Sequence, residues 1–145
     1  MLLNPETFDG VWLAELARAW RDLNQLHFGG ALRRPVLALT DTERRLGCWQ
    51  REGRTLSLSR VLLMKRPWGV VLEVMRHEMA HQYVDEVLRI HDQTAHGPAF
   101  QRVCRERAID GRAIGVPVQD APTPRPAILR KVHALLALAD HNEDS

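Results

Sequence analysis

The sequence predicts a single α+β domain, in which an N-terminal helix precedes a small sheet and two further helices. This prediction rests on apolar residues at helical spacing near the start of the chain and again in its second half, with three short strand-like segments between them. The 145 residues suffice for one domain with its own core. A content of 45% hydrophobic and 26% charged residues argues against disorder over the whole length.

The first predicted helix opens at Asn4-Pro5-Glu6 or at Asp9, because a side-chain acceptor followed by proline or an acidic residue suits a helix N-terminus. Its apolar side chains recur at helical spacing and should face the core: Trp12, Leu13, Leu16, Ala17, Trp20, Leu23 and Leu26. Gly29 and Gly30 end the helix. We assign His27, beside that break, to the surface.

Three short segments are predicted to form an antiparallel sheet. Val36 to Thr40 has the composition of a strand, and residues 47–50 and 55–58 are typical of a hairpin that turns at 51–54. The sheet precedes the segment Val70 to Leu88, whose apolar residues fall on more than one side of a helix, so it is predicted to form a buried helix.

This buried helix contains His77-Glu78-Met79-Ala80-His81. Residues four apart lie on one face of a helix, so His77 and His81 can present two imidazoles to one cation. Glu78 can reach a water at the open position of the metal and take its proton, which is the chemistry of the HExxH signature. Histidines that merely form hydrogen bonds in the core are the alternative, but a buried helix rarely carries so many polar groups without a use.

Three downstream residues could supply a third ligand: His91, His96 and Glu106. A metzincin would need glycine and histidine where this chain has Val84 and Val87, so that class is excluded. His96 stands directly before a predicted helix, 98–110, that starts with proline. The residues alone leave the choice of third ligand open.

HEMAH, followed after fifteen residues by the histidine of HGPAF, resembles the SprT-like (Spartan-like) zinc metalloprotease family. Residues 24–32 (NQLHFGGAL), Gly47-Cys48-Trp49 and 56–59 (LSLS) resemble, in order, the FGG-x-L, GxW and pre-catalytic strand elements of that family. The resemblance covers about residues 11 to 115. It implies a minigluzincin-like zincin domain, with the helix after His96 as support for the metal loop.

The resemblance also implies a site and a function. His77, His81 and His96 would hold one Zn²⁺ per chain, and Glu78 would be the catalytic general base. The chain would then be a zinc metalloendopeptidase that cleaves proteins bound or crosslinked to DNA, with DNA as activator. In zincins an edge strand beside the active-site helix pairs with the substrate, and we expect the 55–58 strand in that place.

Two other functions stay open. The first is a metal-containing DNA-binding module with vestigial peptidase activity, although a structural zinc site has no need of Glu78. The second is a zinc hydrolase unrelated to DNA, which basic residues scattered over the surface would favour. Asp85, one turn after His81, is a weak candidate for a hydrogen bond to a ligand.

Positive charge is concentrated between Arg33 and Arg66, where nine Lys or Arg face three acids, a balance of +6, whereas the rest of the chain has −4. Trp49 lies inside this segment and could stack on an unpaired base of DNA. The candidate phosphate-binding residues around it are Arg44, Arg45, Arg51 and Arg54. The alternative is a solvated face with Trp49 in the core.

Cys48 and Cys104 are isolated, so they form neither a zinc ribbon nor a disulfide framework, and one route to DNA binding found in many relatives is missing. The N-terminus lacks the features of a secretion signal and no segment is long enough to span a bilayer, so we expect a cytoplasmic protein without a membrane partner. The oligomeric state is left open.

The predicted organisation is a protease domain at 1–116, a Pro-rich linker at 117–126 and a C-terminal amphipathic helix at 127–145. Two roles remain open for this last helix. It could pack back onto the domain or another molecule, or it could be the start of a truncated further domain.

Overall fold

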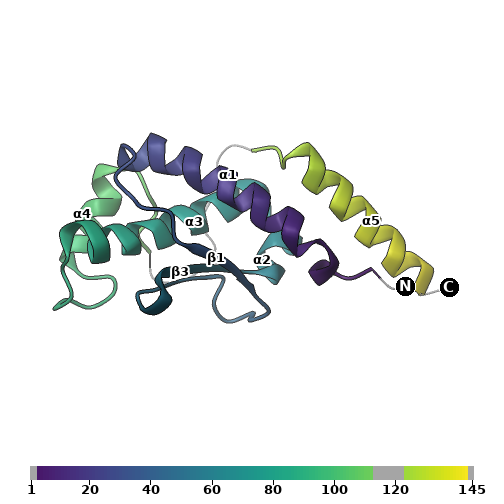
Figure 1. Ribbon diagram of the computed structural model, residues 1–145, viewed down its shortest axis with the longest axis horizontal. Helices are drawn as coiled ribbons and strands as arrows, with labels where there is room; N and C mark the ends of the chain where they lie inside the picture. Colours follow the sequence, from purple (N-terminus) through teal and green to yellow (C-terminus); the bar gives the residue numbers. More distant parts are fainter. Residues whose placement is uncertain (1–2, 113–122, 144–145) are drawn as a thin grey trace.

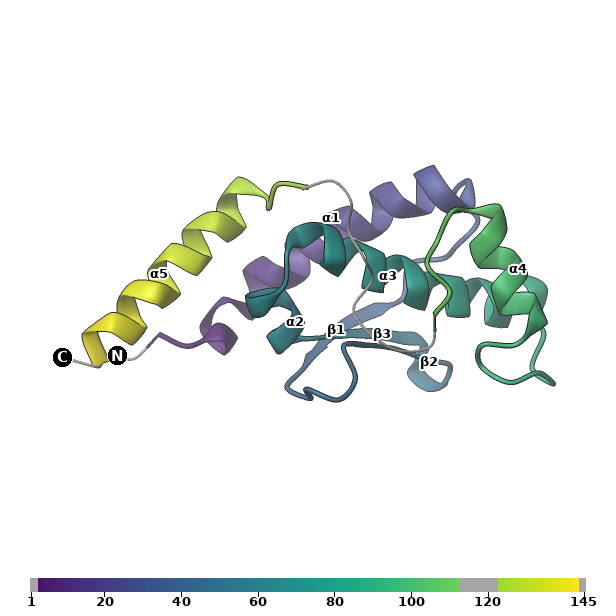
Figure 2. The same ribbon diagram turned by 180° about the vertical axis from the view of Figure 1, so that it is seen from behind.

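The computed structural model describes residues 3–112 and 123–143, which form a mixed α+β fold (Figure 1). The elements, in chain order, are the short turn η1 (Pro5–Phe8), α1 (Asp9–Phe28), β1 (Val36–Thr40), β2 (Gly47–Gln50), the turn η2 (Glu52–Arg54), β3 (Thr55–Ser59), α2 (Arg60–Lys65), α3 (Trp68–Tyr83), the π-helical turn η3 (Val84–Leu88), α4 (Pro98–Glu106) and α5 (Ala127–Glu143). Figures 1 and 2 both place α4 and α5 at opposite ends of the molecule.

The sheet is mixed, which corrects the predicted antiparallel arrangement. Its strand order is β1-β3-β2, with β1 parallel and β2 antiparallel to β3. The 55–58 strand is therefore central, and the prediction that it forms the edge beside the active-site helix is wrong. Leu56, Ser57 and Leu58 are all buried, as expected for a strand covered on both faces and along both sides. The edge strand that packs against α3 is β2.

Helix α1 supplies much of the core through Trp12, Leu16, Trp20 and Leu23. It ends where Gly29 adopts a left-handed conformation with φ of 58°, as Gly29-Gly30 predicted. Leu26 was expected in the core but is 78% exposed. In the last turn of the helix the buried residues are Asn24 and Phe28. Leu26, two residues from each, lies on the opposite side and points to solvent.

The predicted helix 70–88 is present but changes character along its length. Helix α3 ends at Tyr83, and the chain continues as the π-helical turn η3 until Arg89, which has a left-handed conformation with φ of 55°. Such π-turns are frequent next to functional sites because they re-aim the side chains that follow. Helix α3 is buried on several sides, as the apolar pattern predicted.

The C-terminal helix α5 packs back onto the domain. Leu129, Val132 and Leu136 are buried, and the His133 ring meets the edge of the Trp12 ring at a centroid distance of 5.2 Å. The larger part of the predicted linker, residues 117–122, lies outside the described residues, as does the predicted boundary at 116. No helix in the described parts of the chain is long and apolar enough to cross a membrane.

Strand β2 and helix α3 approach closely because Gly47 has no side chain. A Cβ atom at Gly47 would lie 2.8 Å from Val74 Cγ1 and 3.0 Å from Glu78 Cγ. Both distances are shorter than ordinary van der Waals contact, so any larger residue would push the strand away from the helix.

We therefore predict that Gly47→Ala lowers the free energy of unfolding by about 1 to 3 kcal/mol, the usual cost of overpacking. Urea denaturation at a fixed zinc concentration measures the change. Gly10→Ala in α1 is the control, because a Cβ there meets nothing within 4 Å and alanine favours a helix. Equal stability of Gly47→Ala and the parent would contradict the close contact.

Candidate metal centre

Three histidines converge from two elements. His77 and His81 lie one turn apart on α3, and His96 lies in the loop before α4. One ring nitrogen from each lies within 4.8 Å of the others, and the ring centroids are 4.9 to 5.2 Å apart. The structure thus brings together the three residues that the resemblance implied as ligands.

The other two candidates for a third ligand lie outside this cluster. The His91 ring binds Asp85, with 2.6 Å between His91 Nε2 and Asp85 Oδ1. Glu106 is mainly exposed at the end of α4, where it lies 3.5 Å from Arg107. The spatial arrangement therefore favours His96 over both.

Phe100 forms the apolar wall of the cluster. Its ring stacks on that of His81 at a centroid distance of 4.1 Å and meets the edges of the other two imidazoles at 5.0 Å. Pro98 starts α4 directly after the loop that carries His96, and Gln101 donates a hydrogen bond to the His96 carbonyl oxygen at 3.2 Å. The HGPAF segment thus supplies a candidate ligand, a helix start and the apolar wall behind the three imidazoles.

A relay of hydrogen bonds orients His77. Its Nδ1 lies 3.0 Å from the Asp110 carbonyl oxygen, and since a carbonyl only accepts, Nδ1 must carry the proton. The Asp110 N–H donates in turn to Glu73 Oε1 at 2.7 Å, and Glu73 also accepts from Arg76 at 2.9 Å. His77 therefore directs the lone pair of Nε2 toward the cluster, where it lies 3.1 Å from His96 Nε2.

Sequence reasoning missed both members of this relay. Glu73 precedes His77 by four residues on the same face of α3, and that spacing could have pointed to it. The Asp110 carbonyl belongs to the backbone and carries no signal in the sequence. The predicted helix 98–110 also ends earlier, at Glu106, because a left-handed Ala108 with φ of 53° redirects the chain toward His77.

The surroundings favour the neutral form of two of the imidazoles, those of His81 and His96. Burial lowers the pKa of His81 to about 3, and the charges of His77, His96 and Arg45 add to the effect. Burial also lowers the pKa of His96, again with help from His77 and Arg45. Neutral imidazole is the form that binds metal, so the lowered pKa values of His81 and His96 suit a site for Zn²⁺.

Glu78 is buried beside this cluster. Burial raises the pKa of its carboxyl group, although the nearby charges of His77 and Arg45 and a backbone hydrogen bond oppose the shift. That bond comes from the Trp49 N–H, which donates to Glu78 Oε1 at 3.1 Å. A buried carboxylate with a raised pKa and a fixed orientation is well suited to accept and return a proton.

The structure separates the five candidate nucleic-acid-binding residues into two groups. Arg44 and Arg45 are exposed in the loop between β1 and β2, and the charge of Arg45 reaches Glu78 and His81. The other three contact η3, and their side chains already have partners. Trp49 Nε1 donates to Asp85 at 2.9 Å, Arg51 lies 3.6 Å from Asp85, and Arg54 binds Glu86 through two bonds of 2.5 and 2.6 Å.

A family model described as the SprT-like family matches residues 16–118, the segment that holds the three histidines, Glu78 and the sheet. Among curated proteins, no match was found.

We predict that the purified protein binds one zinc ion per chain and that His96→Ala lowers the affinity more than about 100-fold, because an imidazole is removed from the ligand set. Competition with a fluorescent chelator measures the affinity, and elemental analysis measures the stoichiometry. Glu106→Ala is the matched control and should bind zinc as the parent does. The opposite ranking of the two variants would move the site to a His, His, Glu set.

Proposed function

The chain belongs to the SprT-like family, and on that premise we propose that it is a zinc-dependent metalloendopeptidase of the minigluzincin type. The observation that carries the proposal is the position of Glu78, whose carboxylate is held by Trp49 beside three converging imidazoles. A site that only stabilised the fold would not need a buried carboxylate with a raised pKa at this point.

The residues divide the work of peptide hydrolysis among them. His77, His81 and His96 would hold the metal and, being neutral, would leave its charge undiminished. When bound, zinc supplies a Lewis acid that polarises the scissile carbonyl and makes a water molecule more acidic. Glu78 accepts a proton from the attacking water and later delivers it to the leaving amine nitrogen.

The substrate would lie along the free side of β2. This strand is an edge of the sheet, and Trp49 donates its N–H to Glu78 on α3 instead of to β3. The unpaired side of β2 therefore faces the catalytic carboxylate. An extended polypeptide can add to such an edge through backbone hydrogen bonds, which would bring a peptide bond to Glu78.

We further propose that the substrates are proteins bound or crosslinked to DNA and that single-stranded or partly unpaired DNA stimulates cleavage. This proposal is supported by the exposure of Arg44 and Arg45 in the loop that leads into β2. A phosphate chain bound at that loop would lie close to the catalytic centre. Trp49, Arg51 and Arg54 are weaker candidates for DNA contacts, because their polar groups bind η3.

We predict that Glu78→Gln retains zinc and the fold but cleaves peptides about 10² to 10⁴ times more slowly, because the amide cannot accept the proton. Zinc content, circular dichroism and the hydrolysis rate of a quenched fluorescent peptide check the three parts. Glu106→Gln, which alters an exposed glutamate, should cleave at the parental rate. Parental activity in Glu78→Gln would remove this residue from the mechanism.

For DNA we predict that the double variant Arg44→Glu, Arg45→Glu weakens binding of a single-stranded oligonucleotide. The slope of log affinity against log salt should flatten by about 0.7 for each phosphate that the variant no longer binds. The matched control is Arg130→Glu, Lys131→Glu, which makes the same charge change on exposed positions of α5.

Protein cleavage with and without the oligonucleotide completes this test. Stimulation should be present in the parent and the control and absent in the Arg44, Arg45 variant. If the parent cleaves equally well without DNA and the double variant keeps its affinity, a zinc peptidase unrelated to DNA remains. DNA binding without any cleavage would instead favour a vestigial peptidase.

A further inference from the structure

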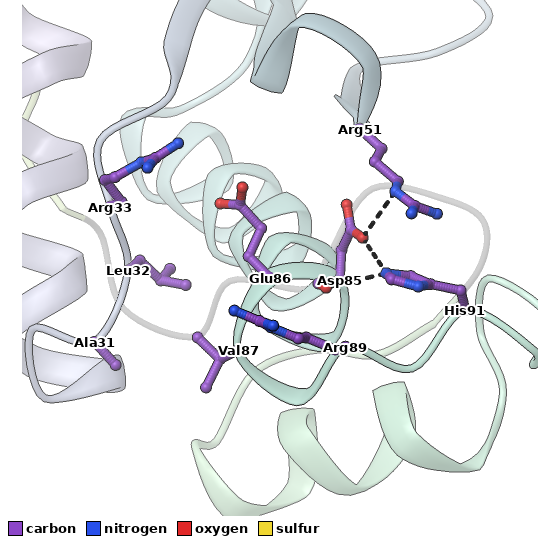
Figure 3. A pocket seen from close by; sticks show the side chains of 9 residues that line it. All are labelled: Ala31, Leu32, Arg33, Arg51, Asp85, Glu86, Val87, Arg89 and His91. Atoms are coloured by element: carbon purple, nitrogen blue, oxygen red, sulfur yellow. Dashed lines mark hydrogen bonds and ion pairs between the residues drawn. The ribbon is translucent and has the colours of Figure 1, made fainter.

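A cavity of about 410 Å³ lies between the turn that follows α1 and the π-helical turn η3, one helical turn beyond His81. Figure 3 shows its lining, with Arg33 and Leu32 on one side, Arg89 and Val87 on another, and Asp85, Arg51 and His91 at the far end. Of these side chains, the proposed function involves only Arg51, as a weaker candidate for DNA contacts.

The cations of this pocket are better able to take a new partner than its anions. Asp85 accepts from Trp49 and from His91, and Glu86 binds Arg54 and Gln82. By contrast, among the residues that the structure describes, Arg33 and Arg89 form no ion pair within 4.0 Å, and Arg33 acts on Glu86 only through its charge, which helps to lower the pKa of that carboxyl group. The pocket therefore offers two guanidinium groups to an anion from outside.

The walls of the pocket are held in place without help from those two guanidinium groups. Asn24 bonds both the N–H and the carbonyl of Leu32, at 3.1 and 3.0 Å. Gln82 donates to the Arg33 carbonyl oxygen at 2.8 Å. A change of the Arg33 side chain therefore leaves the backbone bonds of this wall intact. Leu32 and the partly exposed Val87 add an apolar surface that an aliphatic stem could cover.

The pocket lies in line with the free side of β2, along which the substrate would bind. Trp49 bonds Glu78 through its backbone N–H and Asp85 through its indole, so β2 runs from the catalytic carboxylate to the pocket. Gly47 contacts Glu78, and Arg51 lines the pocket. Four residues of extended chain cover roughly 13 Å, so a peptide along β2 would reach the pocket three or four residues from the cleaved bond.

We propose that this pocket is a substrate subsite that binds an acidic side chain of the polypeptide being cleaved, through Arg33 and Arg89. This inference rests on the proposed peptidase function. An Asp or Glu side chain matches the pocket because it joins a carboxylate to an aliphatic stem, and because the backbone that carries it would already lie along β2. A phosphate of a nucleic acid has no such stem.

The test measures binding to the zinc-loaded Glu78→Gln variant, which should retain peptides uncleaved. Fluorescent ten-residue peptides with a single Glu, moved through successive positions, are compared with the same peptides carrying Gln. Fluorescence anisotropy should show about tenfold tighter binding for Glu at one position. Adding Arg89→Gln or Arg33→Gln should each abolish the preference, whereas adding Arg18→Gln, an exposed arginine of α1, should leave it unchanged.

Equal binding of the Glu and Gln peptides would overturn the subsite, even if the parent cleaves both. A preference that survives both Arg33→Gln and Arg89→Gln would also overturn it. The same holds if the two variants lose affinity for an oligonucleotide while the peptides show no preference, because the pocket would then serve nucleic acid. If the parent cleaves no peptide but the Glu preference depends on both arginines, the subsite stands and the peptidase function fails.

Discussion

The close contact between β2 and α3 determines the geometry of the site. Because Gly47 has no side chain, the strand lies against the helix at the level of Glu78, and the next outward-facing N–H, that of Trp49, reaches the carboxylate. The same tryptophan extends its indole to Asp85 on η3. One short edge strand thereby places the Glu78 carboxylate, the proposed substrate-binding edge and the far pocket in a single line.

The site also depends on two acidic side chains of α3 that are buried in the domain. Glu73 and Glu78 are both buried, and each has partners that compensate for the loss of water. Glu73 takes bonds from Arg76 and from the backbone beyond α4, while Glu78 takes one from β2. The interior of the domain is thus specified by polar contacts to α3 from both sides, in addition to apolar packing.

Sequence reasoning succeeded where the signal was local or repeated a known pattern. The spacing of His77 and His81 follows from helix geometry, and the HGPAF context pointed to His96, which the structure brings into the cluster. Sequence reasoning failed where the structure depended on contacts between residues distant in sequence. Adjacent segments look like a hairpin, so nothing showed that β1 joins the far side of β3 and makes it central. The role of the Asp110 carbonyl was equally hidden, because a backbone group has no residue type.

The spacing of the three histidines has a consequence for the stability of the chain. Cys48 and Cys104 are both free thiols, so no covalent cross-link joins the elements that the structure describes. A cation shared by α3 and the loop before α4 would tie residue 81 to residue 96 and close a ring of about fifteen residues, which in the chain-entropy account of a disulfide is worth roughly 3 kcal/mol. The metal would then act as a reversible cross-link. Metal binding would raise the melting temperature of the domain, in addition to any part that the metal has in the proposed reaction.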